Sequence, residues 1–337
     1  MKRIGFLSFG HWSPARGSEV RSAADALLQT IELAQAAEQV GVDGAYVRVH
    51  HFAPQLASPF PLLAAIGAST SRIEIGTAVI DMRYENPLYA AESAAAADLI
   101  SGGRLQLGIS RGSPETAENG YEAFGFVPEA RETDADLARR HTERFRAAIG
   151  GAGLAYSNPQ LTGQHVPLPI EPRSESLPDR IWWGAGSRAT AVWAAEQGMN
   201  LMSSTLLTED TGVPLSELQA EQLRLYRDAW TAAGHEREPR VSVSRSILPI
   251  IDDETQYYFG LRAQADAEDQ VGYIGGDLAR FGRSYIGAPD VIARELAQDA
   301  AVREADTVLV TVPNQLGVDF NARILESIVR DVAPELG

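Results

Sequence analysis

The sequence predicts an α/β protein, namely a (β/α)8 TIM barrel with insertions in the loops after strands four and seven. Short apolar runs rich in β-branched residues alternate with amphipathic stretches along the whole chain, and this order is typical of parallel βα units. Eight such units follow one another without a linker rich in glycine and serine, which favours one closed barrel over two open sheets. The chain has 337 residues, a common length for a single barrel domain.

Each unit is defined by a strand-like run that is followed by helical periodicity. The helix at 22–40 is the clearest, because Leu27, Ile31 and Ala34 recur at helical spacing on one face. Further helices are expected at 88–100, 187–197, 215–233 and 321–332. We expect the eight strands at residues 4–9, 44–49, 73–80, 105–110, 180–184, 200–203, 241–247 and 307–312.

Two connections are too long to be simple loops between a strand and a helix. The first covers residues 112–134 and the second covers residues 252–286. Two interpretations are open for the second connection, a mobile lid over a pocket and an extra helix packed on the barrel. Its aromatic residues are Tyr257, Tyr258, Phe259, Tyr273 and Phe281.

The charge and the composition argue against several classes of protein. Acidic residues outnumber basic residues by 45 to 29, and the formal net charge of −16 disfavours nucleic acid and anionic membranes as partners. The chain has no cysteine, which excludes disulfides, thiolate metal sites and cysteine nucleophiles. We recognise no signal peptide and no apolar run as long as a membrane span, so we expect a cytoplasmic protein.

The pair His50–His51 follows the second predicted strand. In a βα barrel the reactive groups lie in the segments that follow the strands, at the C-terminal mouth. Neighbouring residues of an extended segment point in opposite directions, so the two rings are not expected to share a metal ion, and we expect no metal site. One ring is suited to carry a proton at neutral pH while the other bonds into the wall. Two structural histidines are the alternative, but the position at the mouth favours the functional interpretation.

A second polar group at the same rim has the features of a phosphate site. Gly186 and Ser187 precede a helix whose first turn also carries Thr190, and the free N–H groups at such a helix start attract anions. Arg111 follows Ser110 at the end of the fourth strand and adds a fixed positive charge. An ordinary N-cap at Ser187 is the alternative.

These residues lie in motifs that resemble the bacterial luciferase-like family of flavin-dependent oxidoreductases. The resemblance covers residues 2–336, and it implies that residues 1–337 form a single luciferase-like barrel domain. An HHF element, a GTA-x-I element and a G-I-x-R-G element occur in the order and approximate spacing of the family. Each element is weak alone, and their combination is specific. The matching segments are GVDGAYVRVHHF (41–52), SRIEIGTAVI (71–80), NPLYAAESAAAADLISGGRLQLGISRG (86–112), GAGSRATAVWAAEQG (184–198) and GAPDVIAREL (287–296).

The resemblance implies an FMN-dependent monooxygenase that uses reduced FMN and dioxygen to oxidise a small organic substrate. It also implies that a separate NAD(P)H-flavin reductase supplies the reduced FMN, and that the chain forms a homodimer. The alanine-rich helix at 88–100 permits close approach, either to the barrel itself or to another subunit. Three alternatives are a deazaflavin-dependent oxidoreductase of the same superfamily, a non-catalytic flavin-binding subunit, and a barrel enzyme with an unrelated phosphorylated ligand.

Carried over by position, the resemblance implies roles for the residues of the rim. His50 would lie beside the flavin ring as a general base or a hydrogen-bond partner, and His51 would support it from the wall. The peptide bond between Ala78 and Val79 would be a non-proline cis bond beneath the ring. The other residues implied to bind the cofactor, chiefly at its phosphate, are Ser110, Arg111, Arg131, Gly186, Ser187 and Thr190.

Two positions depart from the family's pattern. Val49 stands where a glutamate often precedes the histidine pair, and Gly186 stands where luciferases carry an acidic residue. Bioluminescence is therefore not predicted. The substrate is not identified by the residues that we expect to wall its pocket, which are His11, Trp12, Phe52, the residues after strands six to eight and the segment 252–286.

Overall fold

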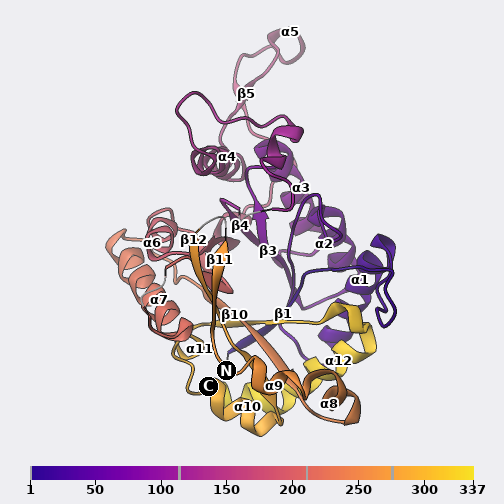
Figure 1. Ribbon diagram of the computed structural model, residues 1–337. Coiled ribbons are helices and arrows are strands. Elements are labelled where there is room, and N and C mark those ends of the chain that lie inside the picture. Colours follow the sequence, from indigo (N-terminus) through magenta and orange to yellow (C-terminus); the bar gives the residue numbers. More distant parts are fainter. Residues whose placement is uncertain (1, 113–114, 210–211, 275–276) are drawn as a thin grey trace.

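The computed structural model describes residues 2–112, 115–209, 212–274 and 277–337. Its centre is a closed parallel barrel of eight strands surrounded by helices, as the sequence predicts (Figure 1). Each strand pairs with the next around the ring, and the last pairs with the first. The barrel strands are β1 (Arg3–Ser8), β2 (Gly44–Val47), β3 (Glu74–Asp81), β4 (Leu105–Ser110), β7 (Ile181–Ala185), β8 (Asn200–Ser203), β10 (Val241–Pro249) and β14 (Thr307–Thr311).

The strand β10 has three partners and closes the barrel. Its first half pairs with β8 and β14, so that Val243 lies opposite Ser203 on one side and Val308 on the other. Its second half pairs with β13 (Ser284–Gly287), which lies outside the ring. The barrel therefore stays eight-stranded although nine strands share the sheet.

The expected strands agree with the observed ones to within two residues at each end, and β2 shows the most informative difference. It ends at Val47 rather than at residue 49. The reason is that the His50 N–H donates to the Leu56 carbonyl at 2.9 Å, inside its own loop, instead of to a neighbouring strand. The histidine pair therefore lies in the loop that follows β2.

The ring of helices begins where the local sequence supplies caps. Ser22 and Asp25 form a capping box at the first helix, and Thr133 and Asp136 form another at α4. No helix in the described part of the chain is long and apolar enough to cross a membrane. The helices of the ring are α1 (Ala23–Gln39), α2 (Pro59–Ser69), α3 (Pro87–Ile100), α4 (Asp134–Ile149), α6 (Arg188–Glu196), α7 (Leu215–Ala232), α10 (Pro289–Leu296), α11 (Ala300–Glu304) and α12 (Val318–Ser327).

The alanine-rich helix α3 turns its small residues toward its own chain. Ala90, Ala91, Ala94, Ala95 and Ala97 are buried, and α3 packs against α2 and α4. The stripe of small residues is therefore explained by packing within the barrel. Large apolar side chains face outward instead, at Tyr89, Leu99 and Ile100.

The two insertions lie where the sequence places them, after the fourth and seventh barrel strands. The first contains a short 3₁₀ turn, η1 (Gly120–Phe124). The second contains α8 (Asp253–Phe259), α9 (Arg262–Ala265) and a hairpin of β11 (Gln270–Ile274) and β12 (Asp277–Phe281), which pairs with β9 (Leu206–Leu207).

In the second insertion, α8 is the extra helix packed on the barrel, so that interpretation is confirmed. The rings of Tyr258 and Phe259, at the end of α8, lie edge-on to Phe320 of α12, with centroids 5.6 and 5.8 Å away. The alternative of a mobile lid stays a prediction for the hairpin. The side chain of Tyr273 lies outside the described part of the structure.

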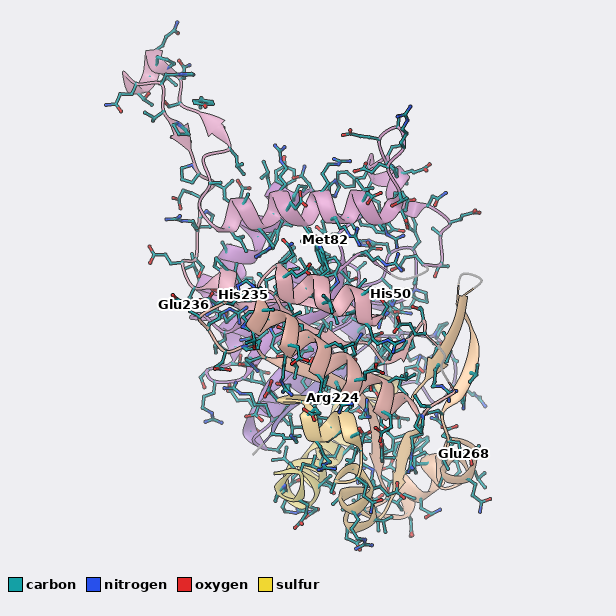
Figure 2. The ribbon with its side chains drawn as sticks, turned by 90° about the vertical axis from the view of Figure 1, so that its left-hand side faces the viewer. His50, Met82, Arg224, His235, Glu236 and Glu268 are labelled. Carbon is teal, nitrogen blue, oxygen red and sulfur yellow. The ribbon has the colours of Figure 1, made fainter. Side chains whose placement is uncertain are left out.

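A third excursion was not predicted. Between α4 and β7 the chain forms an arm of β5 (Ala155–Tyr156), α5 (Pro159–Thr162) and β6 (Pro167–Leu168). Figures 1 and 2 both show the arm projecting away from the barrel. Residues 151–170 contain no aspartate, glutamate, lysine or arginine.

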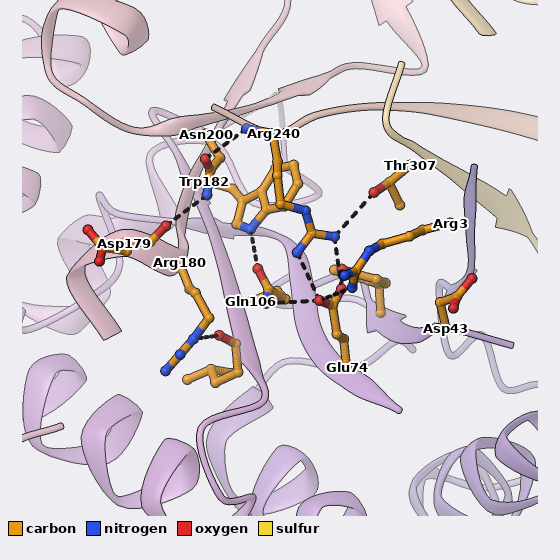
Figure 3. A network of polar contacts seen from close by, with 12 residues as sticks. Arg3, Asp43, Glu74, Gln106, Asp179, Arg180, Trp182, Asn200, Arg240 and Thr307 are labelled. Carbon is orange, nitrogen blue, oxygen red and sulfur yellow. Dashed lines mark hydrogen bonds and ion pairs between the residues drawn. The ribbon is translucent and has the colours of Figure 1, made fainter. Parts of the chain in front are cut away.

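The N-terminal end of the barrel is closed by a polar network (Figure 3). Glu74 accepts hydrogen bonds from Arg3 at 2.6 Å and from both terminal nitrogens of Arg240 at 2.8 and 3.0 Å. Gln106 joins the network, since it donates to Glu74 at 3.3 Å and accepts from the Trp182 indole at 2.8 Å. This end of the barrel is therefore sealed by groups that satisfy one another.

Candidate active site

The predicted site residues lie at the C-terminal mouth, opposite the sealed end. Figure 2 shows His50 on the same side of the molecule as the β11–β12 hairpin, whereas His235 and Glu236, which precede β10, lie on the other side. No group of three or more His, Asp or Glu side chains in the described chain is arranged to hold a metal ion.

His50 is held by partners at both ring nitrogens. Its Nδ1 lies 2.8 Å from the Oε2 atom of Glu115, and its Nε2 accepts a hydrogen bond from Arg48 Nε at 3.1 Å. The Arg48 guanidinium also lies over the ring of Phe9, 5.5 Å from its centroid. Burial lowers the pKa of Arg48, and the nearby Glu115 carboxylate opposes that effect. His50 is therefore fixed in a charged cluster.

His51 lies in a different environment. Its ring stacks on Tyr84 with centroids 4.3 Å apart and meets Phe124 edge-on at 5.1 Å. Burial lowers its pKa, which favours the neutral ring. Its buried Nε2 has no hydrogen-bond partner among the described residues. The structure gives no contact by which His51 supports His50, so the wall role implied for it stays a prediction.

The peptide bond between Ala78 and Val79 is a non-proline cis bond, as the resemblance implies. Ala78 belongs to an apolar cluster of barrel residues that includes Met202, and Val79 packs against the same cluster. Gly108 and Gly184 make room for Val79, because a Cβ atom at either glycine would lie 3.0 Å from Val79 Cγ1. This part of the barrel has an apolar surface.

Ser187 and Thr190 come together at the start of α6. Ser187 is the N-cap and accepts from the Thr190 N–H at 3.3 Å, so the ordinary capping interpretation is confirmed. Their hydroxyl oxygens are 3.0 Å apart. Gly186 has open space where a side chain would project. These three residues form one small polar surface that includes the helix start.

An acidic side chain that the sequence analysis did not single out also reaches this helix. Glu209 Oε2 accepts from the backbone N–H and from Nε of Arg188, both at 3.1 Å. Arg188 makes a second ion pair, to Glu221 at 3.0 Å. One of the free donors of the helix start is therefore taken by a carboxylate.

Arg111 follows β4, which is the neighbour of β7 in the barrel. Its side chain is exposed, and no hydrogen bond or ion pair joins it to the described residues. Ser110 is buried and its hydroxyl accepts from the Gly112 N–H at 2.9 Å, which fixes the turn that presents Arg111. Arg131 is exposed at a φ of 78°. Its predicted role at the phosphate stays a prediction.

A cavity of about 380 Å³ opens between the segments that follow β1 and β14 and the helix α8, and neither His50 nor His51 lines it. Phe9, His11, Tyr258, Phe259 and Val312 contribute to its lining. Burial lowers the pKa of His11, and the positive form of His50 adds to that effect. Of the residues expected to wall the substrate pocket, His11 and three residues of the segment 252–286 line this cavity, whereas Trp12 and Phe52 do not. Their role toward a substrate stays a prediction.

A larger cavity of about 450 Å³ lies outside the barrel, between α7, the base of the hairpin and α10. None of the residues predicted to be catalytic or to bind the cofactor lines it, although residues of the segment 252–286 do. Its innermost arginine, Arg245, is already paired with Asp299 at 2.8 Å. We therefore regard the mouth as the candidate active site.

The residues that sequence reasoning missed are those whose partners are distant in the chain. Glu115 lies 65 positions from His50, and Glu209 lies 21 positions from Arg188. One signal was present, because Glu115 falls in the insertion 112–134, which is long enough to reach over the mouth. Nothing in the local sequence pairs it with a histidine.

The family model for luciferase-like monooxygenases matches residues 4–284. A protein of Sinorhizobium fredii, the uncharacterized protein y4wF, is 31% identical over 204 residues, which are 59% of this chain and 56% of that protein. An alkanal monooxygenase alpha chain from the Kryptophanaron alfredi symbiont is 24% identical over 218 residues, 63% of this chain and 56% of that one. The matched region thus spans little more than half of these relatives.

Solved structures share the whole fold. The monooxygenase RslO1 from Streptomyces bottropensis has a TM-score of 0.76 at 21% identity, covering 99% of this chain and 100% of its own. The FMN complex of the oxygenating constituent of 3,6-diketocamphane monooxygenase from Pseudomonas putida has a TM-score of 0.70 at 16% identity, covering 99% and 98%. The coenzyme F420-dependent tetrahydromethanopterin reductase from Methanopyrus kandleri has a TM-score of 0.68 at 15% identity, covering 100% and 99%. With the match of the family model over most of the chain, the barrel and its mouth identify this protein as a member of the luciferase-like monooxygenase family.

Proposed function

We propose that this chain is an FMN-dependent monooxygenase that uses reduced FMN and dioxygen to oxidise a small organic substrate. Reduced FMN supplies the reaction with dioxygen when it is bound, and the protein supplies the binding surface, the orientation and the proton carriers. The proposal extends the family membership to one cofactor and one reaction.

The observation that carries the proposal is Arg111, which has no hydrogen bond or ion pair to the described residues and follows the strand that neighbours the one leading to the start of α6. Arg111 follows β4, and the adjacent β7 leads into Gly186, where no atom fills the space of a side chain. An arginine and the donors of a helix N-terminus are a strong combination for a phosphate monoester. Ser187 and Thr190 add two hydroxyl groups to the same surface.

The rest of the mouth fits an aromatic ring system attached to that phosphate. Val79, at the cis peptide, presents an apolar surface toward Gly108 and Gly184. The buried His51 Nε2 lacks a partner in the described chain, so it would bond a polar atom of a ligand only after a movement that exposes it. Apolar walls with a few polar groups are typical of cofactor sites.

Glu209 opposes phosphate binding in the observed arrangement. Its carboxylate occupies the N–H of Arg188 and places a negative charge at the helix start. We propose that Glu209 turns away when the phosphate binds. A Glu209→Gln variant is then expected to bind FMN more tightly than the unmodified protein, as measured by fluorescence titration.

Titration with each cofactor tests the proposal. FMN, reduced FMN and coenzyme F420 are added separately to the purified protein, and binding is followed by flavin fluorescence and by calorimetry. We expect binding of FMN in a micromolar range or tighter, and weaker binding of F420. Binding of F420 with none of FMN would instead support the deazaflavin alternative.

Oxygen uptake tests the reaction. Reduced FMN is supplied by an NAD(P)H-flavin reductase, which we propose as the separate source of reducing equivalents. Substrate-dependent oxygen uptake with an oxygenated product is the expected result, with a panel of small organic compounds as substrates. Oxygen consumption no faster than that of free reduced FMN, with every compound, would favour a non-catalytic flavin-binding subunit.

We also propose a homodimer, with the outer face of α3 as its contact. Tyr89, Leu99 and Ile100 are 71%, 53% and 53% exposed on that helix, and large apolar side chains on one exposed face commonly mark an interface. Sedimentation equilibrium is expected to give twice the mass of 36.3 kDa. A Leu99→Glu, Ile100→Glu variant is expected to give the monomer. Cytoplasmic location and the absence of a nucleic-acid partner stay predictions.

A further inference from the structure

The segment after β4 sends one carboxylate into the mouth, and that carboxylate contacts His50. The Glu115 side chain is 4% exposed and the His50 side chain is 15% exposed, with 2.8 Å between Oε2 and Nδ1. A carboxylate that is almost fully buried loses its hydration and therefore requires a partner. The short distance to the His50 ring supplies one.

The partner on the other side of the ring fixes where the His50 proton lies. A guanidinium can only donate hydrogen bonds, so Arg48 Nε requires an unprotonated Nε2 as its acceptor. The single proton of the neutral ring then resides on Nδ1, directed at Glu115. Glu115 and Arg48 together select one tautomer of His50.

This tautomer determines which nitrogen is able to act. With Nδ1 bonded to Glu115, Nε2 is the atom that accepts a proton, after the Arg48 contact of 3.1 Å opens. Proton uptake at Nε2 turns the ring into a cation, and the new N–H bond is the one covalent bond that forms on His50. A carboxylate 2.8 Å from Nδ1 stabilises that cation and keeps the ring oriented.

None of the described residues next to the histidine pair offers another free carboxylate to His50 Nδ1. Val49 is 3% exposed and packs in the main apolar core. The other charged and titratable groups near His50 are Arg48, His11 from the β1 loop, and His51. Asp81 is already bonded through both carboxylate oxygens to Arg83. Glu115 is therefore the carboxylate in contact with His50 in the described chain.

We propose that Glu115, supplied by the insertion after β4, is a positioning residue that holds the Nδ1–H tautomer of His50 and leaves Nε2 as its proton-accepting atom. The proposal rests on the proposed function for its catalytic consequence. The contact itself does not depend on that function.

The first experiment uses the cofactor-free protein. A histidine N–H that is buried and bonded to a carboxylate exchanges slowly with water and gives a downfield proton resonance. We expect this resonance in the unmodified protein and in Glu118→Gln, an exposed glutamate of the same insertion that serves as the control. We expect it to be lost in Glu115→Ala and in His50→Ala. Absence from the unmodified protein, or persistence in Glu115→Ala, would overturn the proposal.

The second experiment uses the FMN-loaded enzyme. Glu115→Ala is expected to lower kcat roughly 10²-fold, near the lower end of what a positioned acid–base group contributes, with the Kd for FMN changed less than about threefold. Glu115→Gln keeps an oxygen that accepts the Nδ1 proton, so its kcat is expected to lie between those of the alanine variant and the unmodified enzyme. An unchanged kcat in Glu115→Ala, or an equal loss in Glu118→Gln, would overturn the positioning role.

The two experiments separate this proposal from the proposed function. If the unmodified protein neither binds FMN nor consumes oxygen, the proposed function fails, while the resonance still decides whether Glu115 holds His50. If the enzyme is active but Glu115→Ala is equally active, only the positioning role fails.

Discussion

The two ends of the barrel differ in how far their polar groups satisfy one another. At the N-terminal end, Glu74 is bonded to Arg3, Arg240 and Gln106. At the mouth, Arg111 and the Nε2 atom of His51 have no partner within the described ranges. A folded chain leaves few buried polar groups unpaired. We therefore expect the Glu74 network to maintain the fold, whereas the unpaired Arg111 supports the proposed binding of a molecule at the mouth.

His50→Ala tests the functional end with the largest expected effect. We expect turnover to fall by about 10²- to 10⁴-fold if His50 carries a proton in the reaction, with FMN binding nearly unchanged. Steady-state kinetics and FMN titration measure the two quantities. The same loss of turnover accompanied by an equal loss of FMN affinity would assign His50 to binding instead.

Glu74→Ala tests the structural end. Its removal leaves the guanidinium of Arg240, which is 25% exposed, without its carboxylate. We expect the free energy of unfolding in urea to fall by about 3 kcal/mol, at the low end for a broken buried pair because Arg3 is half exposed. The Kd for FMN is expected to be unchanged. Glu326→Ala, at an exposed ion pair with Arg330, is the control and should unfold like the unmodified protein.

Arg111→Ala tests whether the mouth binds the FMN phosphate. A charge-assisted hydrogen bond to a phosphate contributes about 1.5–3 kcal/mol, so we expect FMN to bind about 10- to 100-fold more weakly. Stability should not fall, because no described residue depends on the Arg111 side chain. Arg131→Ala is measured in parallel. An equal weakening by both variants would restore Arg131 to the phosphate site.

Glu85, between β3 and α3, gives the smallest expected effect and a dependence on pH. Burial, together with the neighbouring Asp81, raises the pKa of Glu85 from its ordinary value of 4.5 to about 7. The folded chain therefore binds the proton more tightly than the unfolded chain, and stability should fall as the pH rises from about 4.5 to about 7. The full shift corresponds to on the order of 3 kcal/mol, and the partial exposure of Glu85 reduces the expected change below that value. Glu85→Gln should flatten this part of the stability profile; a profile of unchanged slope would contradict the shift.

The sequence was sufficient for the barrel because its signals are local. Runs such as 105–110 and 307–312 combine β-branched and apolar residues within a few positions, and their ends were predicted to within one residue. The arm was missed because β5 and β6 have two residues each, too few for a period. Its compositional signal, the absence of charge, says nothing about conformation.

The candidate site was predictable only in part, for a related reason. Residues at strand ends were placed at the mouth by topology, and the cis bond at Ala78 was placed by family resemblance. The contacts that set the state of His50 join segments 65 positions apart. Which carboxylate of an insertion reaches a given ring depends on the path of the whole loop, and no local pattern encodes that path.

The arm has a practical consequence for engineering this barrel. Its two strands leave and return side by side, joined where the Leu154 N–H donates to the Leu168 carbonyl at 2.9 Å. The spacing between α4 and β7 is therefore set at the base of the arm, and the tip, where Leu161 is 84% exposed, has little to do with it. A peptide tag or a small reporter domain grafted at the tip would be displayed away from the catalytic mouth, at a point where the body of the enzyme need not rearrange to accept it.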